Sequence, residues 1–297
     1  MPTRKPAASK KTSSDEWHFR LSAIRHDPED PAAVADLSRA LDSSSNFVVA
    51  KAAQIIEIRQ DFELRGKLGD AFARMFESPH KLDPTCAALT AIVKALHSMD
   101  CEDATPFFKG VRHVQMEGSF GPSVDAAVGL RANCAVALAR HTHPQVIAEL
   151  TERLADREAG ARLGAATALG CCGLPAAFPL LHFKTLAGDP EPDVITECYA
   201  SMLVLDGRQA VELIREALNG GEYAESAALA LGPSRHAEAF PILKERYEAL
   251  VGGSLRQTVL LAISLCRTPE AMTFMEPLEH LLKRYGRFGT RRASQVL

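Results

Sequence analysis

A short Ala-rich motif that recurs along the chain constrains the fold more than any other feature of the sequence. Its clearest copy is Asp156–Gly173, which reads DREAGARLGAATALGCCG. The apolar residues of this copy recur at three- and four-residue intervals, the spacing of one face of a helix. The copy therefore predicts a helix that ends at Gly173, and its recurrence predicts that the helix is one of a series.

Seven copies can be aligned on one late apolar residue. These anchors are Ile56, Leu96, Leu138, Leu169, Leu203, Leu231 and Ile263. They lie 40, 42, 31, 34, 28 and 32 residues apart, within or near the range of two-helix repeats. The positions one, three and four residues before the anchor carry no charge in any copy. We therefore expect each copy to bury a stripe of small apolar residues, with Cys134 among them.

A turn-forming residue precedes the helix of the first copies. The position thirteen residues before the anchor is Ser43, Asp83, Asp125 or Asp156 in the first four copies, and Pro190 with Asp189 beside it in the fifth. Ser and Asp are favoured N-caps because their side-chain oxygens accept hydrogen bonds from the first turn of a helix. We expect these residues to cap the repeated helices.

A second kind of helix is expected between the copies. A leading helix is predicted at Glu16–His26, and Met116–Ser123 is predicted to be an inserted loop. The partner helices are predicted at Ala32–Leu41, Phe62–Phe76, Ala104–Gln115, Gln145–Ala155, Ala176–Ala187, Gln209–Leu218, Ala237–Leu250 and Pro269–Tyr285. The chain is thus predicted to be all-α and built from helix pairs.

The repeated motif resembles HEAT repeats, and most closely the Ala-rich bacterial variety named after phycobilisome lyases. The residues that carry the resemblance best are Asp156, Arg162, Ala165, Ala166, Ala168, Leu169 and Gly170. The resemblance covers roughly Pro31 to the last helix. It implies an α-solenoid, an armadillo-like right-handed superhelix of about seven helix pairs, whose second helices line the concave side, where partners usually bind.

This architecture leads us to expect a non-enzymatic scaffold or adaptor that binds another protein or peptide. The expected partner-binding residues are polar side chains in variable columns of the second helices: Arg131, Asn133, Arg162, Glu197, Glu225, Arg256 and Gln257. No catalytic residue, cofactor or metal site is expected. In the family, an arginine stands near the start of each second helix. Here only Arg131, Arg162 and Arg256 occupy that position, so we do not expect a continuous row of arginines.

Charge is distributed unevenly between the ends and the body of the chain. Nine of the 34 lysines and arginines lie in residues 1–14 and 283–297, which contain no acid, and the residues between them carry a balance of −12. We expect a disordered basic tail at 1–14, a solenoid at 15–285 and a basic tail at 286–297. An acidic body argues against nucleic acid as the partner. A nucleic-acid-associated protein that acts through its basic ends remains an alternative.

A bilin or chromophore lyase is a second alternative, suggested only by the relatives that give this repeat type its name. Other HEAT-like enzymes fit less well. Hydroxylases with two irons use adjacent His-Glu pairs, and no His in this chain is followed by Glu. DNA glycosylases need a basic groove with exposed aromatic residues. His141 and His143 form the only close histidine pair, and Pro144 follows them, so we expect a polar turn there.

The cysteines and the apolar stretches of the sequence indicate the cellular compartment in which the protein is expected. The seven cysteines form no Cys-x-x-Cys pair, which is typical of a reducing compartment. The first residues contain no apolar segment of the kind found in secretory signals. The longest stretch without a charged residue, 163–183, is interrupted by glycines and prolines. We therefore expect a soluble, cytoplasmic protein without a membrane span.

Overall fold

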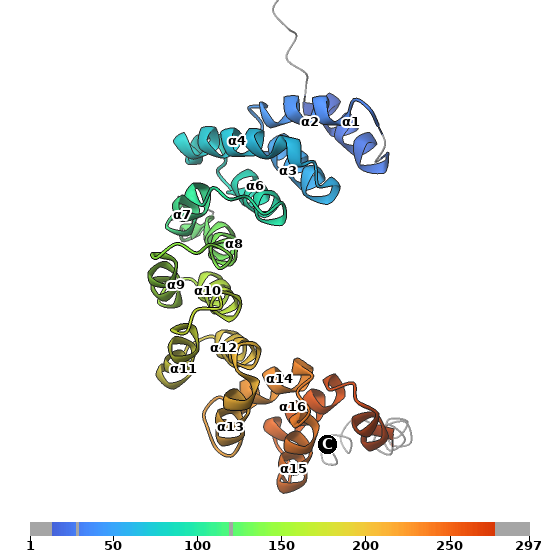
Figure 1. Ribbon diagram of the computed structural model, residues 1–297, viewed down its shortest axis with the longest axis vertical. Helices are drawn as coiled ribbons and strands as arrows, with labels where there is room; N and C mark the ends of the chain where they lie inside the picture. The colour runs from blue at the N-terminus through green and yellow to red at the C-terminus, as the bar shows by residue number, and fades with distance from the viewer. Residues whose placement is uncertain (1–13, 28–29, 119–120, 277–297) are drawn as a thin grey trace, which may run out of the picture. The chain divides into compact units, whose positions relative to one another are not determined.

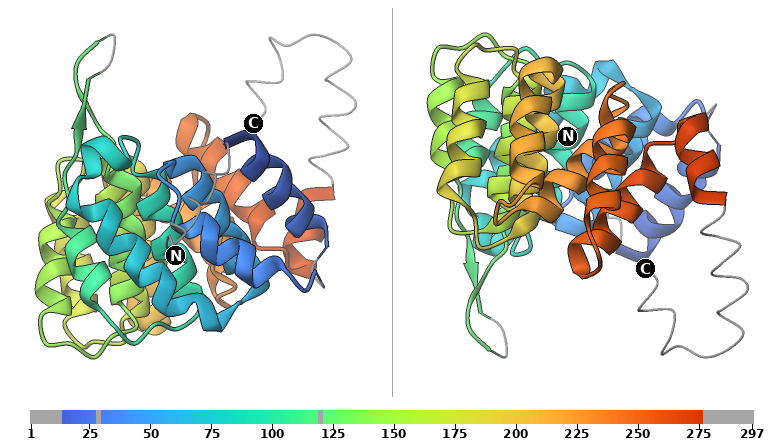
Figure 2. Two further views of the ribbon diagram at one scale, coloured as in Figure 1. Left: turned by 90° about the horizontal axis from the view of Figure 1, so that it is seen from above. Right: turned by 90° about the horizontal axis from the view of Figure 1, so that it is seen from below.

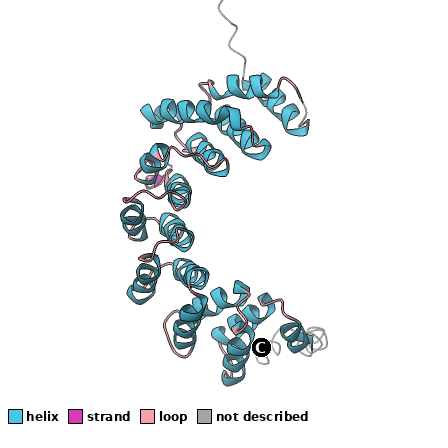
Figure 3. Cartoon of the chain, viewed as in Figure 1, coloured by secondary structure: helices cyan, strands magenta, loops and turns pink. Residues whose placement is uncertain are grey.

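A computed structural model describes residues 14–27, 30–118 and 121–276. These residues form helices, apart from one pair of two-residue strands (Figures 1 and 3). The predicted all-α class is confirmed. The basic segments 1–13 and 277–297, with the tails predicted within them, lie outside the described residues.

The chain divides into two compact units, Met1–Leu138 and Ala139–Leu297. In the first unit the helices alternate between two layers. The second helices α3, α6 and α8 pack in a row, and the first helices α2, α4 and α7 pack beside them. The elements of this unit are α1 (Ser14–His26), α2 (Ala33–Leu41), α3 (Asn46–Arg59), η1 (Phe62–Leu64), α4 (Arg65–Glu77), α5 (Pro79–Leu82), α6 (Ala87–Ser98), α7 (Thr105–Val111), β1 (Met116–Glu117), β2 (Val124–Asp125) and α8 (Val128–Leu138).

The predicted loop at Met116–Ser123 lies within a short β-hairpin that projects from the helices of the first unit (Figure 2). β1 and β2 pair antiparallel, with Met116 opposite Asp125. At its base, the Gln115 backbone N–H donates to Asp125 Oδ1 at 3.1 Å, and the Gln115 side chain donates to the Asp83 carbonyl at 3.0 Å. These buried hydrogen bonds tie the hairpin to the turn before α6.

The second unit repeats the two-layer arrangement. The second helices α10, α12, α14 and α16 pack consecutively, and each also packs against the first helix that precedes it. The elements of this unit are α9 (Val146–Leu154), α10 (Ala159–Cys171), α11 (Ala177–Ala187), α12 (Pro192–Leu205), α13 (Gly207–Leu218), α14 (Ala224–Leu231), η2 (Gly232–Ser234), α15 (Ala239–Ala249) and α16 (Ser254–Leu265). Residues 269–276 are also helical.

The expected apolar stripes form the core. Six of the seven anchor residues are buried, and Cys134 is fully buried. α10 ends as predicted, because Gly173 follows it with a φ of 64°, the left-handed conformation that closes many helices. Inside α10, a Cβ on Gly170 would lie only 2.7 Å from Ser201 Cβ on α12. Gly170 therefore permits the close approach of these two helices.

The fifth copy of the motif is shifted by one residue from the predicted alignment. Leu203, the predicted anchor, is partly exposed, as is Ala200 three residues before it, whereas Met202 is fully buried. With Met202 as the anchor, the position thirteen residues earlier is Asp189 instead of Pro190. The misalignment arose because this helix offers two apolar residues in succession.

Candidate functional site

Most of the predicted Asp and Ser residues form turns before the second helices and do not cap the helices themselves. Oδ1 of Asp125, Asp156 and Asp189 accepts a hydrogen bond from the backbone N–H two residues later, at 2.9, 3.0 and 2.9 Å. Ser43 Oγ accepts in the same way from Ser45, at 3.1 Å. The N-caps of α10 and α12 are Glu158 and Glu191, whose side chains make no capping bond. The capping prediction was wrong for Ser43, Asp125, Asp156 and Asp189, because these residues form Asx-type and Ser turns before the helix. It is confirmed for Asp83, whose Oδ2 accepts a hydrogen bond at 2.8 Å from the Leu89 N–H in the first turn of α6.

Two of the expected partner-binding residues, Arg131 and Arg162, are buried in ion pairs. Arg131, of which 1% is exposed, donates to Asp125 Oδ2 at 2.7 Å and to the His113 carbonyl at 2.9 Å. Arg162, of which 7% is exposed, donates to both carboxylate oxygens of Asp189 at 2.7 Å. Both guanidinium groups therefore hold turns inside their own units instead of facing solvent.

Asp189 is the centre of a buried cluster of ion pairs in the second unit. Besides Arg162, its carboxylate contacts Lys184 Nζ at 2.8 Å. Burial alone would raise the pKa of Asp189, but the hydrogen bonds from Arg162 and Lys184 outweigh it and hold the pKa at about 2. Asp189 is therefore ionised at neutral pH, and its charge is offset by two cations.

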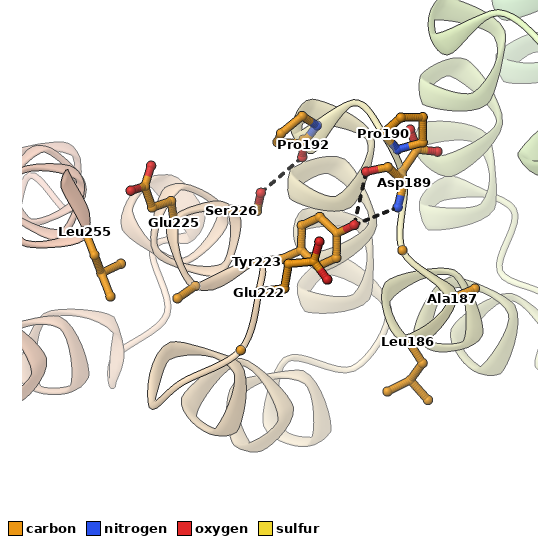
Figure 4. A pocket seen from close by; sticks show the side chains of 13 residues that line it. Leu186, Ala187, Asp189, Pro190, Pro192, Glu222, Tyr223, Glu225, Ser226 and Leu255 are labelled. Carbon is orange, nitrogen blue, oxygen red and sulfur yellow. Dashed lines mark hydrogen bonds between the residues drawn. The ribbon is translucent and has the colours of Figure 1, made fainter.

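A hollow of about 790 Å³ opens beside this cluster, where the turns before α12 and α14 meet the start of α16 (Figure 4). The Tyr223 hydroxyl accepts from the Asp189 N–H at 3.0 Å and donates to the Asp189 carbonyl at 3.1 Å. Ser226 Oγ donates to the Pro192 carbonyl at 3.1 Å. These bonds join the two turns, so the wall of the hollow is fixed by hydrogen bonds between neighbouring helix pairs.

The lining of the hollow combines apolar surface with negative charge. Leu186, Pro190 and Leu255 contribute apolar atoms, and the residues that line it include acids but no base. Glu222 and Glu225 are exposed, and neither forms an ion pair within the described part of the chain. A ligand that suits this hollow would carry positive charge together with apolar or aromatic surface.

The five other expected residues lie in different surroundings. Glu197, Glu225 and Gln257 lie on the successive second helices α12, α14 and α16. In the first unit, Asn133 donates to the Gly129 carbonyl of its own helix at 2.7 Å. Arg256 lies over the Tyr247 ring, with Cζ 4.0 Å from the centroid. The structure thus places five of the seven expected residues on the second helices of the second unit, although Arg162 among them is buried.

The row of helices α10, α12, α14 and α16 also exposes apolar side chains. Val204 on α12 is 73% exposed, Leu261 on α16 is 53% exposed, and Leu163 on α10 is also exposed. Thr167 on α10 donates to Glu197 on α12 at 2.8 Å, so the exposed stripes of the two helices adjoin. We call these exposed residues of α10, α12, α14 and α16 the second-helix face.

Of the residues that line the hollow, the sequence singled out only Glu225 as a partner-binding residue. Glu222 and Tyr223 follow the paired glycines 220–221, and Pro190 and Pro192 flank Glu191. One signal in the sequence could have identified the Asp189 turn. If Met202 is taken as the anchor, Asp189 occupies the same position as Asp125 and Asp156, and two prolines follow it closely.

The cysteines of the core are poor nucleophiles. Burial raises the pKa of Cys86 and that of Cys198 to about 12, and it also raises the pKa of Cys134. Thiols with such pKa values are protonated at neutral pH, whereas the thiolate is the reactive form. Within residues 14–27, 30–118 and 121–276, no group of three or more His, Cys, Asp or Glu is placed to hold a metal ion.

No protein-family model matches this sequence, and no curated protein matches it. Among the described helices, none has the length and apolar character needed to cross a membrane.

Proposed function

We propose that this chain is an α-solenoid of HEAT-like helix pairs that serves as a scaffold for another protein, which binds along the second-helix face. The proposal is supported by the two-layer packing of first and second helices within each unit. It is also supported by the recurrence of the Asp or Ser turn before the second helices. Stacked helix pairs of this kind use extended surfaces for binding.

The observation that carries the proposal is the exposed apolar surface on the second helices. Val204, Leu261 and Leu163 are exposed on α12, α16 and α10, which also carry the polar residues Glu197 and Gln257, and these helices belong to the consecutively packed row α10, α12, α14 and α16. Apolar anchors within a polar surround are the usual composition of a protein-binding surface. The partner is thus a protein that covers these apolar side chains.

Affinity capture from native lysate with the full-length chain as bait tests this function. The Val204→Glu and Leu261→Glu variants each place a charge on the second-helix face. We expect each to reduce recovery of a specific partner by about tenfold or more, because a charge in the centre of an apolar interface is costly.

The matched control is Phe183→Glu, which makes the same change on the first helix α11 at a side chain that is 68% exposed. This variant should recover the partner as well as the parent chain does. If all three variants recover the same proteins, or if only the control loses them, the second-helix face is not the binding surface.

A further inference from the structure

The second-helix face of the second unit combines its apolar side chains with acids. On α12, Asp193, Glu197 and Val204 recur at intervals of four and seven residues, so they share one outward stripe of the helix. Glu225 adds a third acid on α14. We propose that the partner bound on this face is an amphipathic helix that is basic along one side and apolar along the other. This inference rests on the function proposed above and specifies the chemistry of the partner.

The second helices of this unit supply no base to neutralise these acids. The sequences of α10, α12, α14 and α16 contain two arginines, Arg162 and Arg256, and no lysine or histidine. Arg162 is buried against Asp189, and the Arg256 guanidinium lies over the Tyr247 ring. Within the described part of the chain, the three acids of the face form no ion pair. The face therefore presents negative charge without a counter-charge of its own.

The helices of the row begin on the same side of the face (Figure 1). Thr167 contacts Glu197 and, one turn later, Gly170 approaches Ser201, so α10 and α12 run in the same direction. A hydrogen bond from α14 to the Pro192 carbonyl joins the N-terminal ends of α12 and α14. Residues at the same depth in these helices therefore line up across the row.

This alignment separates the acids from the apolar anchors. Asp193 and Glu197 lie in the first two turns of α12, and Glu225 lies in the first turn of α14. Val204 and Leu261 lie in the C-terminal halves of α12 and α16. A helix that crosses the row would thus meet acids with one side and apolar side chains with the other.

The size of the row sets the length of such a helix. Packed helices lie up to about 10 Å apart, so a crossing from α10 to α16 covers roughly 30 Å. A helix rises 1.5 Å per residue, so the partner segment contains about 20 residues. Bases on one side of it favour association with an acidic surface, and apolar residues on the other side provide the buried anchors.

Fluorescence anisotropy with the full-length chain and synthetic peptides tests this inference. The probe is a labelled amphipathic peptide of leucine and lysine, about 20 residues long. Two comparison peptides carry glutamate in place of lysine, or serine in place of leucine. We expect the leucine–lysine peptide to bind and each comparison peptide to bind about tenfold more weakly or less, because one loses the charge complementarity and the other loses the apolar contact.

Neutral variants test whether the peptide binds at the acids of the face. Asp193→Asn, Glu197→Gln and Glu225→Gln are combined in one chain. Glutamine at position 197 keeps an oxygen that can accept the hydrogen bond from Thr167. We expect the combination to weaken binding of the leucine–lysine peptide by roughly fivefold or more, since three exposed charge pairs are lost.

The matched control removes the same charge from exposed acids outside the face. Glu238, Glu245 and Glu248 are exposed at the start of α15 and along it. They already pair with Arg215 or Lys244, at 3.3, 3.7 and 3.9 Å. Replacing all three with glutamine should change the affinity for the peptide by less than about twofold, because distant substitutions act independently.

Four outcomes would overturn the inference. These are no binding of the leucine–lysine peptide, equal binding of the three peptides, equal effects of the two sets of substitutions, or release by the peptide of a self-associated form of the chain in sedimentation velocity. The last would identify a second copy of this chain as the occupant.

Failure of this inference can be distinguished from failure of the proposed function. If Val204→Glu and Leu261→Glu lose their partner while the peptide experiment fails, the face binds a protein that is not basic. If these two variants capture the same proteins as the parent chain, the proposed function fails and this inference fails with it.

Discussion

At the scale of single residues, Asp189 is bonded to side chains from three separate segments of the second unit. Arg162 reaches it from the preceding second helix, Lys184 from the adjoining first helix, and Tyr223 contacts its backbone from the turn before α14. Asp189 therefore links three helix pairs, through its carboxylate to Arg162 and Lys184 and through its backbone to Tyr223. Its removal leaves two cations without their counter-charge, and breaking a buried ion pair in this way is strongly destabilising.

We predict that Asp189→Asn lowers the free energy of unfolding by about 3 kcal/mol at neutral pH. Urea denaturation followed by circular dichroism measures the change. Asp193→Asn, which neutralises an exposed acid four residues later, should change stability by less than about 0.5 kcal/mol. Equal effects of the two substitutions would show that the ion pairs of Asp189 contribute nothing specific.

The same carboxylate predicts a dependence on pH. Its folded-state pKa of about 2 lies below the unfolded value of about 4. The stability that Asp189 contributes is therefore fully present above about pH 4 and is lost as the pH falls through about 2. We expect the difference in unfolding free energy between the parent and Asp189→Asn to shrink by about 2 kcal/mol between pH 5 and pH 2. A difference that stays constant over this range would exclude the low pKa.

At the scale of helices, the close contact of α10 and α12 depends on a missing side chain. A Cβ at Gly170 would lie 3.0 Å from Ser201 Cα as well as 2.7 Å from Ser201 Cβ. Because one of these atoms belongs to the backbone, the helices must separate to accept a methyl group.

Gly170→Ala should therefore destabilise the protein by about 1–3 kcal/mol, although Ala favours helix more than Gly does. The control is Gly69→Ala within α4, where a Cβ meets nothing within 4 Å. That substitution should stabilise by about 0.5–1 kcal/mol, because Gly costs backbone entropy in a helix. Stabilisation by both substitutions, measured by thermal unfolding, would contradict the tight contact.

The helices themselves were predictable because each rests on a local pattern. The stripes around Cys134 and Leu169 have helical periodicity, and the helix end at Gly173 requires only a residue that accepts positive φ. The roles of Arg131 and Arg162 were not predictable in this way. An arginine on a second helix is buried only if the fold places a carboxylate of a turn next to it. The local sequence around the arginine does not reveal that contact.

The candidate sites were less predictable than the helices. The hollow is assembled from segments that lie about thirty residues apart in the sequence. The Asp189 turn beside it was missed because the motif was aligned on Leu203 instead of Met202. The β-hairpin after Gln115 was also missed, since each of its strands is only two residues long. Such short strands leave no periodicity to detect.

At the scale of the whole chain, the main contacts of the described helices in each unit are with helices close to them in sequence. α10 packs against α9, α11 and α12, and α12 packs against α10, α11, α13 and α14. In arrays of this kind, stability is approximately a sum of local terms. A local defect should therefore remain local.

We predict that Gly170→Ala accelerates amide hydrogen exchange in α9–α12 and leaves the exchange rates of α2, α3 and α6 unchanged. Exchange measured by mass spectrometry on the full-length chain resolves these segments. A uniform acceleration over both units would show that the chain unfolds as one cooperative body instead.

The double attachment of the turn before α12 also has a mechanical consequence. Arg162 holds this turn from the preceding helix pair and Tyr223 holds it from the following one, so a pulling force along the second unit passes through side chains at this point. The turns before α14 and α16 have Leu218 and Leu250 in place of the Asp. Under tension the second unit would therefore yield first toward α16, and the stretch from α10 to α12 would be the last to open.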